Sequence, residues 1–297
     1  MDLVLRSIIP LPGWSVSPPT PRTPNCSGAR SSALDPHSGT APAACEQPHP
    51  VADRHWDGAL GTVADGVVID TETVTVSECS EQRRDVLLAI AAQVPAPDGA
   101  DAVRVAVDGV DGSGKSVFAD QLAGVLREQT RPVVRASVDD FHHNRVQRYR
   151  RGRSSPNGFW LDSFDYDRLR HDLLDPLGPG GSRRYRAAVH DLDTDQHLDL
   201  PWVVGPPGVV LVLDGLFLHR DELHGLWGLS VFLDVPFDVT AARMAARDGS
   251  NPDPHHPSMR RYVDAQRIYF KSCMPATRAD LVIDNSDWDR PALQADR

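Results

Sequence analysis

The chain has few cysteines and no long hydrophobic run. Its 297 residues include 4 cysteines, which are scattered and form no CxxC pair and no His–Cys metal spacing. This pattern excludes a disulfide-stapled scaffold and the common zinc sites. No stretch approaches the ~20 consecutive apolar residues that a membrane-spanning helix needs. We therefore expect reduced thiols, a cytoplasmic location and no membrane partner.

The chain also has fewer basic residues than acidic ones. Lys and Arg total 31 against 41 Asp and Glu, which gives a net charge of −10. An acidic chain of this kind is poorly suited to general nucleic-acid binding, because the phosphate backbone repels it. We expect no nucleic-acid partner, although a local basic pocket is compatible with the balance. A homo-oligomer is also compatible with the sequence.

Proline is abundant but unevenly placed. Of the 25 prolines, ten fall within residues 1–60, which are also rich in serine. Such a composition cannot bury enough apolar surface to offset the entropy of the chain. Residues 1–62 are therefore predicted to form a disordered, dispensable tail. Asp2, Pro10 and Pro12 fit a secretory signal poorly.

The rest of the chain alternates between apolar runs and amphipathic runs. Residues 63–99 are predicted to be an extension with a strand or hairpin at 66–76 and a helix at 80–94, and residues 100–290 to be the main domain. Its strands are apolar nearly throughout, which is typical of a parallel sheet covered on both faces. We expect an α/β three-layer sandwich with a mainly parallel five-stranded sheet. The expected strands are 100–108, 132–139, 208–215, 229–235 and 279–285, and the expected helices are 115–129, 164–175, 236–247 and 258–274.

Residues 176–207 break this alternation. Glycine and proline punctuate two short polar segments, 184–190 and 196–204, that have the character of strands. We therefore expect a hairpin-like insertion at the edge of the sheet.

A glycine-rich loop follows the first strand of the main domain. Residues 109–116, GVDGSGKS, fit the pattern GxxxxGK[ST] and lead directly into a helix. Glycines let backbone N–H groups curl around a phosphate, and the helix N-terminus adds positive partial charge. Lys115 would reach the outer phosphates, and the Ser116 hydroxyl would ligate Mg²⁺. The loop predicts a nucleoside triphosphate site in a P-loop NTPase fold, with the binding residues Gly109, Asp111, Gly112, Ser113, Gly114, Lys115, Ser116 and Val117.

Carboxylates follow the second and third strands of the expected sheet. Asp139 and Asp140 end SVDD, and Asp214 ends VLVLD. The carboxyl edge of a parallel sheet is where ligands bind, so these groups are candidates for a general base and for Mg²⁺ ligands. Asp140 could instead cap the next element, and Asp214 could orient a turn.

Six sequence blocks occur in a fixed order between residues 103 and 285. They are GVDGSGKS, SVDDFHH, DSFDYDRLRHDLLDPL, VLVLDGLFLHRDEL, VFLDVPFDVTAARMAARD and RRYVDAQRIYFKSCMPATRADLVIDN. In this order they resemble the uridine kinase-like branch of the phosphoribulokinase/uridine kinase family. The resemblance implies an ATP-dependent kinase that acts on a hydroxyl of a small metabolite, with ATP and Mg²⁺ as cofactors.

The same resemblance implies roles for single residues. Asp139 would be the catalytic base, and Ser116, Asp214 and Asp139 would lie at Mg²⁺. A helical lid over the phosphates would carry Arg247 as a catalytic residue. Arg243 lies four residues earlier, on the same face of that helix.

Several departures from the family pattern fall on the acceptor pocket. Phe159 stands where uridine–cytidine kinases carry an aspartate that grips the ribose. In the insertion, residues 190–192 align with a YDF-type segment, and Asp195 falls near a histidine that contacts the base. Arg261 replaces the glutamine of a glutamine–tyrosine pair. The candidate substrate contacts are Phe159, Asp162, His190, Arg243 and Arg261.

The identity of the acceptor is left open by these departures. Uridine or cytidine kinase, which forms a nucleoside 5′-monophosphate, is the nearest named activity. Another acceptor, such as a sugar phosphate or a vitamin precursor, is the alternative. The arginines of residues 145–153 and Arg261 would suit negative charge on it, although that run could equally be a solvated loop. An interpretation of another class is a nucleotide-binding switch without phosphotransfer.

Overall fold

Six strands form one sheet in the computed structural model, which describes residues 79–294. The strand order is β10-β9-β8-β1-β7-β2, and neighbouring strands are parallel except β10 and β9. The five-stranded parallel sheet expected from the sequence is confirmed. The strands are β1 Val103–Gly109, β2 Val133–Ser137, β7 Val210–Gly215, β8 Leu229–Asp234, β9 Leu281–Asp284 and β10 Ala292–Leu293.

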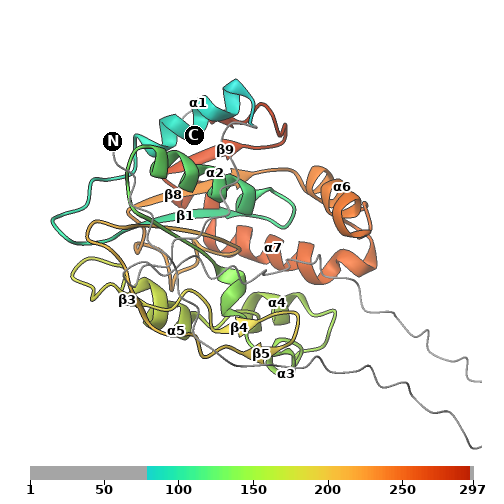
Figure 1. The fold of residues 1–297 in the computed structure, drawn as a ribbon. Helices are drawn as coiled ribbons and strands as arrows, with labels where there is room; N and C mark the ends of the chain where they lie inside the picture. Colours follow the sequence, from blue (N-terminus) through green and yellow to red (C-terminus); the bar gives the residue numbers. More distant parts are fainter. Residues whose placement is uncertain (1–78, 295–297) are drawn as a thin grey trace, which may run out of the picture. The chain divides into compact units, whose positions relative to one another are not determined.

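Helices cover both faces of this sheet (Figure 1). On one face, α1 (Glu81–Ala91) and α2 (Lys115–Glu128) pack over the side chains of Val105 and Val107. On the other face, α7 (Arg260–Cys273) and several shorter helices form a second core that includes Ala106. Because side chains alternate along β1, the strand contributes to both cores and is buried on both sides. The three-layer sandwich expected from the sequence is confirmed.

The long helices match their predictions, whereas the short ones were not predicted. The structure contains α1, α2, α6 (Phe237–Asp248) and α7, and the helix expected at 164–175 is split into α5 (Tyr166–Leu169) and a π-helical turn, η3 (Arg170–Leu174). The short α3 and α4 begin at the capping side chains of Asn144 and Ser155. Elements of this length depend on caps and packing more than on hydrophobic periodicity. The additional short elements are η2 Val138–Phe141, α3 Arg145–Arg148, α4 Pro156–Asp162, η4 Pro257–Met259 and α8 Pro275–Arg278.

The insertion is a nested pair of antiparallel ladders, as the sequence predicts. The outer ladder joins β3 (Arg184–Tyr185) to β6 (Val203–Val204), and the inner ladder joins β4 (His190–Asp191) to β5 (Gln196–His197). Asp195 lies in the turn of the inner ladder with φ at 59°. Aspartate tolerates this left-handed region better than most residues.

Two expectations fall on other parts of the chain. The tail at 1–62 and the strand at 66–76 lie outside the described residues. Within residues 79–294, every helix is too short or too polar to cross a bilayer.

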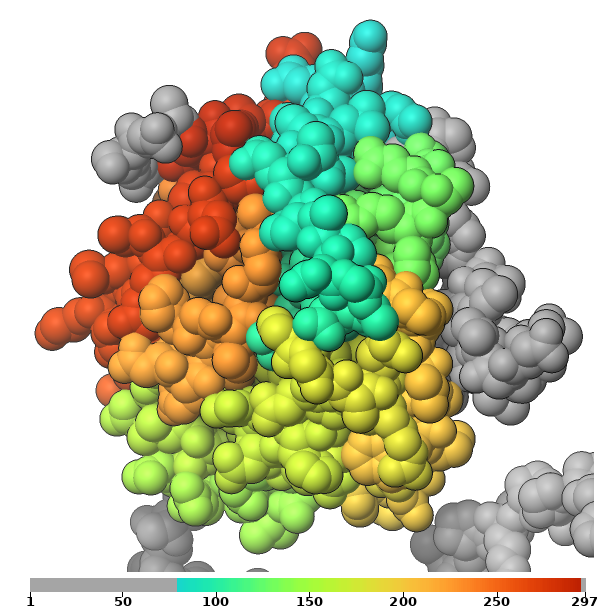
Figure 2. Space-filling view, turned by 90° about the vertical axis from the view of Figure 1, so that its left-hand side faces the viewer, coloured from blue at the N-terminus to red at the C-terminus, as the bar shows by residue number. Residues whose placement is uncertain are grey.

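Helix α1 is fastened to the C-terminal part of the described chain by Arg83. Figure 2 shows α1 and the C-terminal residues on the same face of the molecule. The fully buried Arg83 donates to Gln121 Oε1 at 2.6 Å, to Asn285 Oδ1 at 2.9 Å and to the Trp288 carbonyl at 3.0 Å. Its guanidinium also lies over the rings of Phe118 and Trp288. Burial lowers the pKa of Arg83 to about 10.

Replacing Arg83 should therefore destabilise the domain. Arg83→Ala leaves several buried acceptors without donors, and we expect the free energy of unfolding to fall by about 2–4 kcal/mol. Its neighbour Arg84 forms an exposed ion pair with Glu128, so Arg84→Ala should cost less than about 1 kcal/mol. Urea denaturation of both variants measures the difference. Equal losses would show that the buried contacts of Arg83 contribute little.

Candidate active site

The glycine-rich loop connects β1 to α2 in a conformation that its glycines permit. Gly112 and Gly114 have φ values of 75° and 86°. A Cβ on Gly112 would lie 2.6 Å from the Thr240 carbonyl oxygen, and one on Gly114 would lie 2.6 Å from the Trp288 ring. Gly114 is the N-cap of α2 and offers no side chain to its first N–H groups. These N–H groups therefore remain available to an anion.

Polar side chains in the loop fit a phosphate ligand. The Ser113 hydroxyl is buried and has no hydrogen-bond partner within residues 79–294. The Lys115 ammonium is also mostly buried and lies 4.0 Å from Asp111 Oδ1. A buried donor without a partner is costly, and a phosphate oxygen would satisfy it. The geometry of the loop is thus compatible with the predicted binding of nucleotide phosphates.

Ser116 and Asp214 meet at the carboxyl edge of the sheet. Asp214 ends β7 between β1 and β2, where it pairs with Val107 and Ser137 in register. The Ser116 hydroxyl donates to Asp214 Oδ2 at 2.6 Å, and Arg135 lies 2.8 Å from Oδ1. The two residues predicted to ligate Mg²⁺ therefore lie side by side, with a buried arginine next to them.

Arg135 was not among the predicted site residues. Its guanidinium bridges Asp214 and Asp120, at 2.8 and 2.7 Å. Burial opposes the charge on Asp214, but Arg135, Ser116 and Lys115 outweigh it and hold the pKa of this carboxyl below its ordinary value. Asp214 is thereby kept ionised. The signal in the sequence is an arginine within the otherwise apolar strand VVRAS.

Asp139 lies just beyond β2, in η2, at the same edge of the sheet. The strand ends at Ser137, two residues before the expected boundary, and the Ser137 hydroxyl accepts from the Asp139 N–H at 3.3 Å. The Asp139 carboxylate is half-buried and accepts no hydrogen bond from any residue between 79 and 294. A carboxylate that is near the phosphate loop and not already hydrogen-bonded suits a general base.

Asp111 links the loop to the other predicted catalytic residues. Its Oδ2 accepts from the amide of Gln266, on α7, at 2.7 Å. Burial raises the pKa of Asp111, Asp139 adds to the effect, and Lys115 and Arg247 act against it. These charges act on Asp111 only if they lie close to it. The charges that act on Asp111 thus include three of the predicted catalytic residues, Lys115, Asp139 and Arg247.

Helix α6 carries Arg247, the arginine that the sequence assigns to a lid over the phosphates. It packs through Met244 on Met259 and Val263. Arg247, near its C-terminus, is exposed and forms an ion pair with Asp248 at 2.8 Å. Arg243 instead donates to the carbonyls of Asn285 and Ser286, at 2.8 and 2.9 Å, and lies 3.4 Å from that of Gly112. Arg243 thus braces the phosphate loop rather than facing a substrate.

A buried network supports the start of the loop and was not predicted. Asp108 ends β1 and accepts from the Gly109 N–H at 2.7 Å, from His219 Nδ1 at 2.8 Å and from the Tyr269 hydroxyl. Tyr269 belongs to α7 and His219 follows β7, so Asp108 joins three elements at the base of the loop.

Two of the predicted acceptor contacts, Phe159 and Arg261, have different surroundings. Phe159 packs edge-on against Tyr262, with ring centroids 5.0 Å apart. Arg261 is buried and donates to the carbonyl of Arg148 at 3.1 Å and to that of Ser155 at 3.3 Å. Arg261 is therefore committed to the backbone of the 148–155 segment, contrary to the expectation that it would attract an anionic acceptor.

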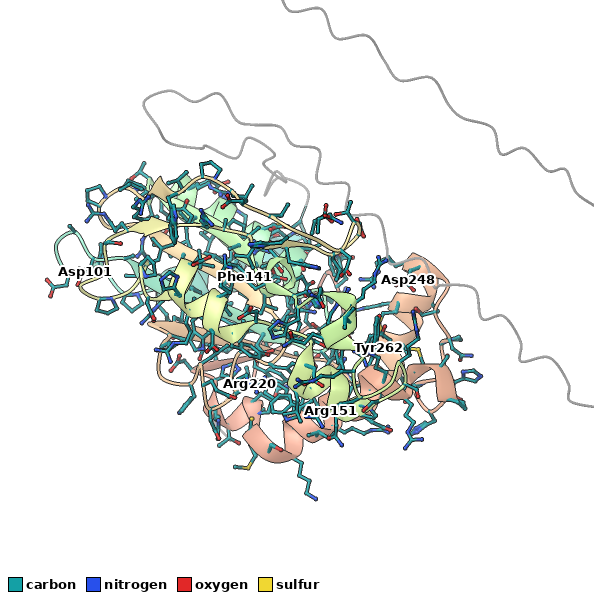
Figure 3. All side chains as sticks on the ribbon, turned by 90° about the horizontal axis from the view of Figure 1, so that it is seen from below. Asp101, Phe141, Arg151, Arg220, Asp248 and Tyr262 are labelled. Atoms are coloured by element: carbon teal, nitrogen blue, oxygen red, sulfur yellow. The ribbon has the colours of Figure 1, made fainter. Side chains whose placement is uncertain are left out.

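The arginine run of residues 145–153 is largely paired within the protein. Asp162, which is fully buried, forms ion pairs with Arg150 and Arg151, and Arg148 pairs with Asp195 at 3.3 Å. Figure 3 shows Arg151 and Tyr262 in the same view from below. Asp162, expected to contact substrate, instead neutralises this loop, and the run is neither a free basic patch nor a wholly solvated one.

Two histidines lie behind Asp139. His142 Nδ1 contacts the Asp139 carbonyl at 2.7 Å, and burial lowers the pKa of His142 to about 4. His190 Nε2 lies 3.3 Å from Asp195 Oδ1, and burial also lowers the pKa of His190. Both rings are therefore neutral near pH 7 and can act as hydrogen-bonding groups, which keeps His190 a candidate acceptor contact.

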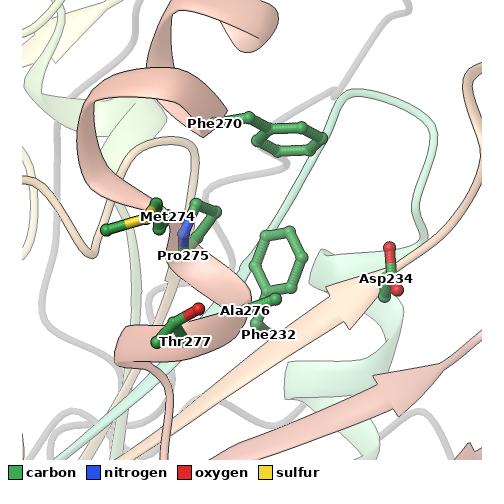
Figure 4. Close-up of a pocket in the computed structure, with 7 residues that line it drawn as sticks. All are labelled: Phe232, Asp234, Phe270, Met274, Pro275, Ala276 and Thr277. Atoms are coloured by element: carbon green, nitrogen blue, oxygen red, sulfur yellow. The ribbon is translucent and has the colours of Figure 1, made fainter. Parts of the chain in front are cut away.

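A separate pocket lies away from the loop. It has a volume of about 290 Å³, and none of the predicted site residues lines it (Figure 4). Its lining is mainly apolar, and Asp234 is its charged residue. The predicted site residues therefore lie outside this pocket.

Comparisons with known proteins agree with this site. The model of the phosphoribulokinase/uridine kinase family matches residues 104–283. Uridine kinases from Ureaplasma urealyticum and Ureaplasma parvum are each 24% identical over 147 residues, which is 49% of this chain and 69% of theirs. A Bacillus stearothermophilus structure described as a possible uridine kinase is 25% identical, with a TM-score of 0.53 over 67% of this chain and 97% of the other. The chain therefore belongs to the phosphoribulokinase/uridine kinase family and is a P-loop kinase of small molecules.

Proposed function

We propose that the protein transfers the γ-phosphoryl group of ATP to a hydroxyl group of a small metabolite. The observation that carries this proposal is the position of Asp139, a carboxylate without a hydrogen-bond donor, close to Asp111 and hence to the phosphate loop. Family membership excludes the alternative of a switch without phosphotransfer.

The residues suggest how the reaction proceeds. Asp139 takes the proton of the acceptor hydroxyl while the new O–P bond forms and the bond to the β-phosphate oxygen breaks. Lys115 and the N–H groups at the start of α2 stabilise negative charge on the phosphoryl group, and ADP leaves. Arg247 would add positive charge when the lid closes.

Mg²⁺ would be held by Ser116 and Asp214, with Asp139 nearby. No group of three or more His, Cys, Asp or Glu within residues 79–294 is arranged to hold a metal ion. Magnesium in kinases is commonly bound through one or two carboxylates together with the phosphates of the nucleotide, and the ionised Asp214 fits this pattern. When bound, the ion neutralises charge on the phosphate oxygens.

The second part of the proposal concerns which compound accepts the phosphoryl group. Uridine and cytidine are the nearest named acceptors, because the proteins similar to this chain include uridine kinases. Phe159, however, packs on Tyr262 and presents an apolar side chain. The Arg261 guanidinium is already hydrogen-bonded to a backbone carbonyl. Neither residue offers a free polar group to a ribose. Without hydrogen bonds to a ribose from these two positions, the site loses selectivity for a ribose. We therefore propose another uncharged acceptor as the better substrate.

A metabolite panel tests the proposal. ADP release from ATP should depend on one added hydroxyl compound, and the product should gain one phosphoryl group by mass spectrometry. Uridine and cytidine should be poor substrates, with KM values near ~1 mM, at the weak end of the usual range. Micromolar KM with efficient turnover would identify an ordinary uridine kinase. ATP consumption that no hydroxyl compound stimulates would contradict phosphotransfer itself.

A further inference from the structure

Asp111 is an unexpected residue in a loop that binds phosphate. It occupies the third position of GVDGSGKS, where a carboxylate repels a phosphate instead of binding it. The loop needs no side chain there, because its N–H groups and Lys115 supply the phosphate contacts. The Asp111 carboxylate must therefore serve a partner other than the nucleotide phosphates.

The contacts of Asp111 place it on the acceptor side of the loop. Gln266, which is buried and donates to Oδ2 at 2.7 Å, lies on α7 one turn after Tyr262. Tyr262 packs on Phe159 of α4, and its pKa is raised by burial first and also by the nearby Asp111. Asp111 thus lies between the phosphate loop, the wall formed by α4 and α7, and the general base Asp139.

The charges around Asp111 disfavour an anionic acceptor. The negative charge of Asp139 lies close enough to Asp111 to raise its pKa further, after burial. Arg151 is paired with Asp162, and the Arg261 guanidinium contacts backbone carbonyls. The positive charges that act on Asp111 are Lys115 and Arg247, and in the proposed function both serve the phosphoryl group of ATP. An acceptor that carried a phosphate or carboxylate near its reacting hydroxyl would therefore meet two carboxylates, with neither Arg151 nor Arg261 free to offset them.

We propose that Asp111, oriented by Gln266, is a specificity-determining residue of the acceptor site. Its carboxylate accepts a hydrogen bond from a second hydroxyl of the acceptor, next to the one that Asp139 deprotonates. The acceptor class is accordingly an uncharged compound with neighbouring hydroxyls. This inference rests on the proposed function, because it assumes phosphotransfer to a hydroxyl.

Matched acceptor pairs test the role of Asp111. Ribose and ribose 5-phosphate, fructose and fructose 6-phosphate, and uridine and uridine 3′-phosphate differ in charge and in the one hydroxyl that the phosphate esterifies. The unaltered protein should use the neutral member of at least one pair with a kcat/KM at least ~10-fold higher. Asp111→Asn keeps the shape and an acceptor oxygen for Gln266. It should raise the KM for the neutral acceptor ~10–100-fold and reduce the ratio of kcat/KM between the neutral and phosphorylated members of the pair. The KM for ATP should stay within about 2-fold of that of the unaltered protein.

Gln266→Leu provides a second variant that leaves the loop sequence intact. It removes the donor that orients Asp111, so it should raise the KM for the acceptor in the same direction while the KM for ATP stays unchanged. A purely structural role would raise both KM values together in both variants, and would overturn the proposal. Preference for the phosphorylated members would overturn it as well. Failure of every compound in the panel to be phosphorylated would instead contradict the proposed function.

Discussion

Lys115→Ala should abolish measurable phosphotransfer while the protein remains folded. In the proposed function, the positive charge of Lys115 acts on the transferring phosphoryl group, and this side chain is largely removed from solvent. Electrostatic stabilisation is strong in such a site, and loss of one preorganised donor typically costs ~10²–10³-fold in kcat. Steady-state ADP release, with the circular dichroism melting curve as a check on folding, measures the effect.

The chain offers a matched control for this substitution. Its sequence contains two lysines, and the second, Lys271, is exposed near the end of α7. Lys271→Ala should leave kcat unchanged. If Lys115→Ala retained near-normal turnover, the assignment of residues 109–116 to phosphate binding would be wrong.

Asp139→Asn should separate chemistry from nucleotide binding. Asparagine keeps the shape of aspartate but is a far weaker base, and loss of a general base costs ~10²–10⁴-fold. The KM or Kd for ATP should change little, because the Lys115 loop is untouched. Single-turnover phosphotransfer together with equilibrium binding of a fluorescent ATP analogue gives both quantities.

The neighbouring residue Asp140 provides a control for the Asp139→Asn substitution. Asp140→Asn changes the same functional group one residue further along η2. We expect a much smaller loss of phosphotransfer from it than from Asp139→Asn. The reverse order would transfer the role of base to Asp140.

The features that the sequence predicts well are local ones. The loop at 109–116 is defined by a short spacing, and the strands around it are continuous apolar runs, so both can be recognised without knowing the fold. The sequence singled out Asp139 and Asp214 for the same reason, because each lies at the carboxyl end of such a strand. β10 was missed because it has two residues and pairs only with β9.

The features that were missed depend on contacts between distant segments. Arg135 could not be assigned to the site without the pairing of β2 with β7, which brings it beside Asp214. The same limit explains the error over Arg261. Sequence shows that a side chain is charged, but not that carbonyls more than a hundred residues away already occupy it.

The anchoring of α1 has a consequence for where the catalytic unit begins and ends. The match to the family spans residues 104–283, yet Arg83 precedes it and Asn285 follows it. Asn285 also donates to the Ser113 carbonyl at 2.7 Å, so the two flanking segments together hold the outer side of the phosphate loop. A gene fragment cut at the limits of similarity would encode every catalytic group and still lack the brace that fixes their geometry. The segment that resembles the family is therefore shorter than the segment whose contacts hold the loop in position.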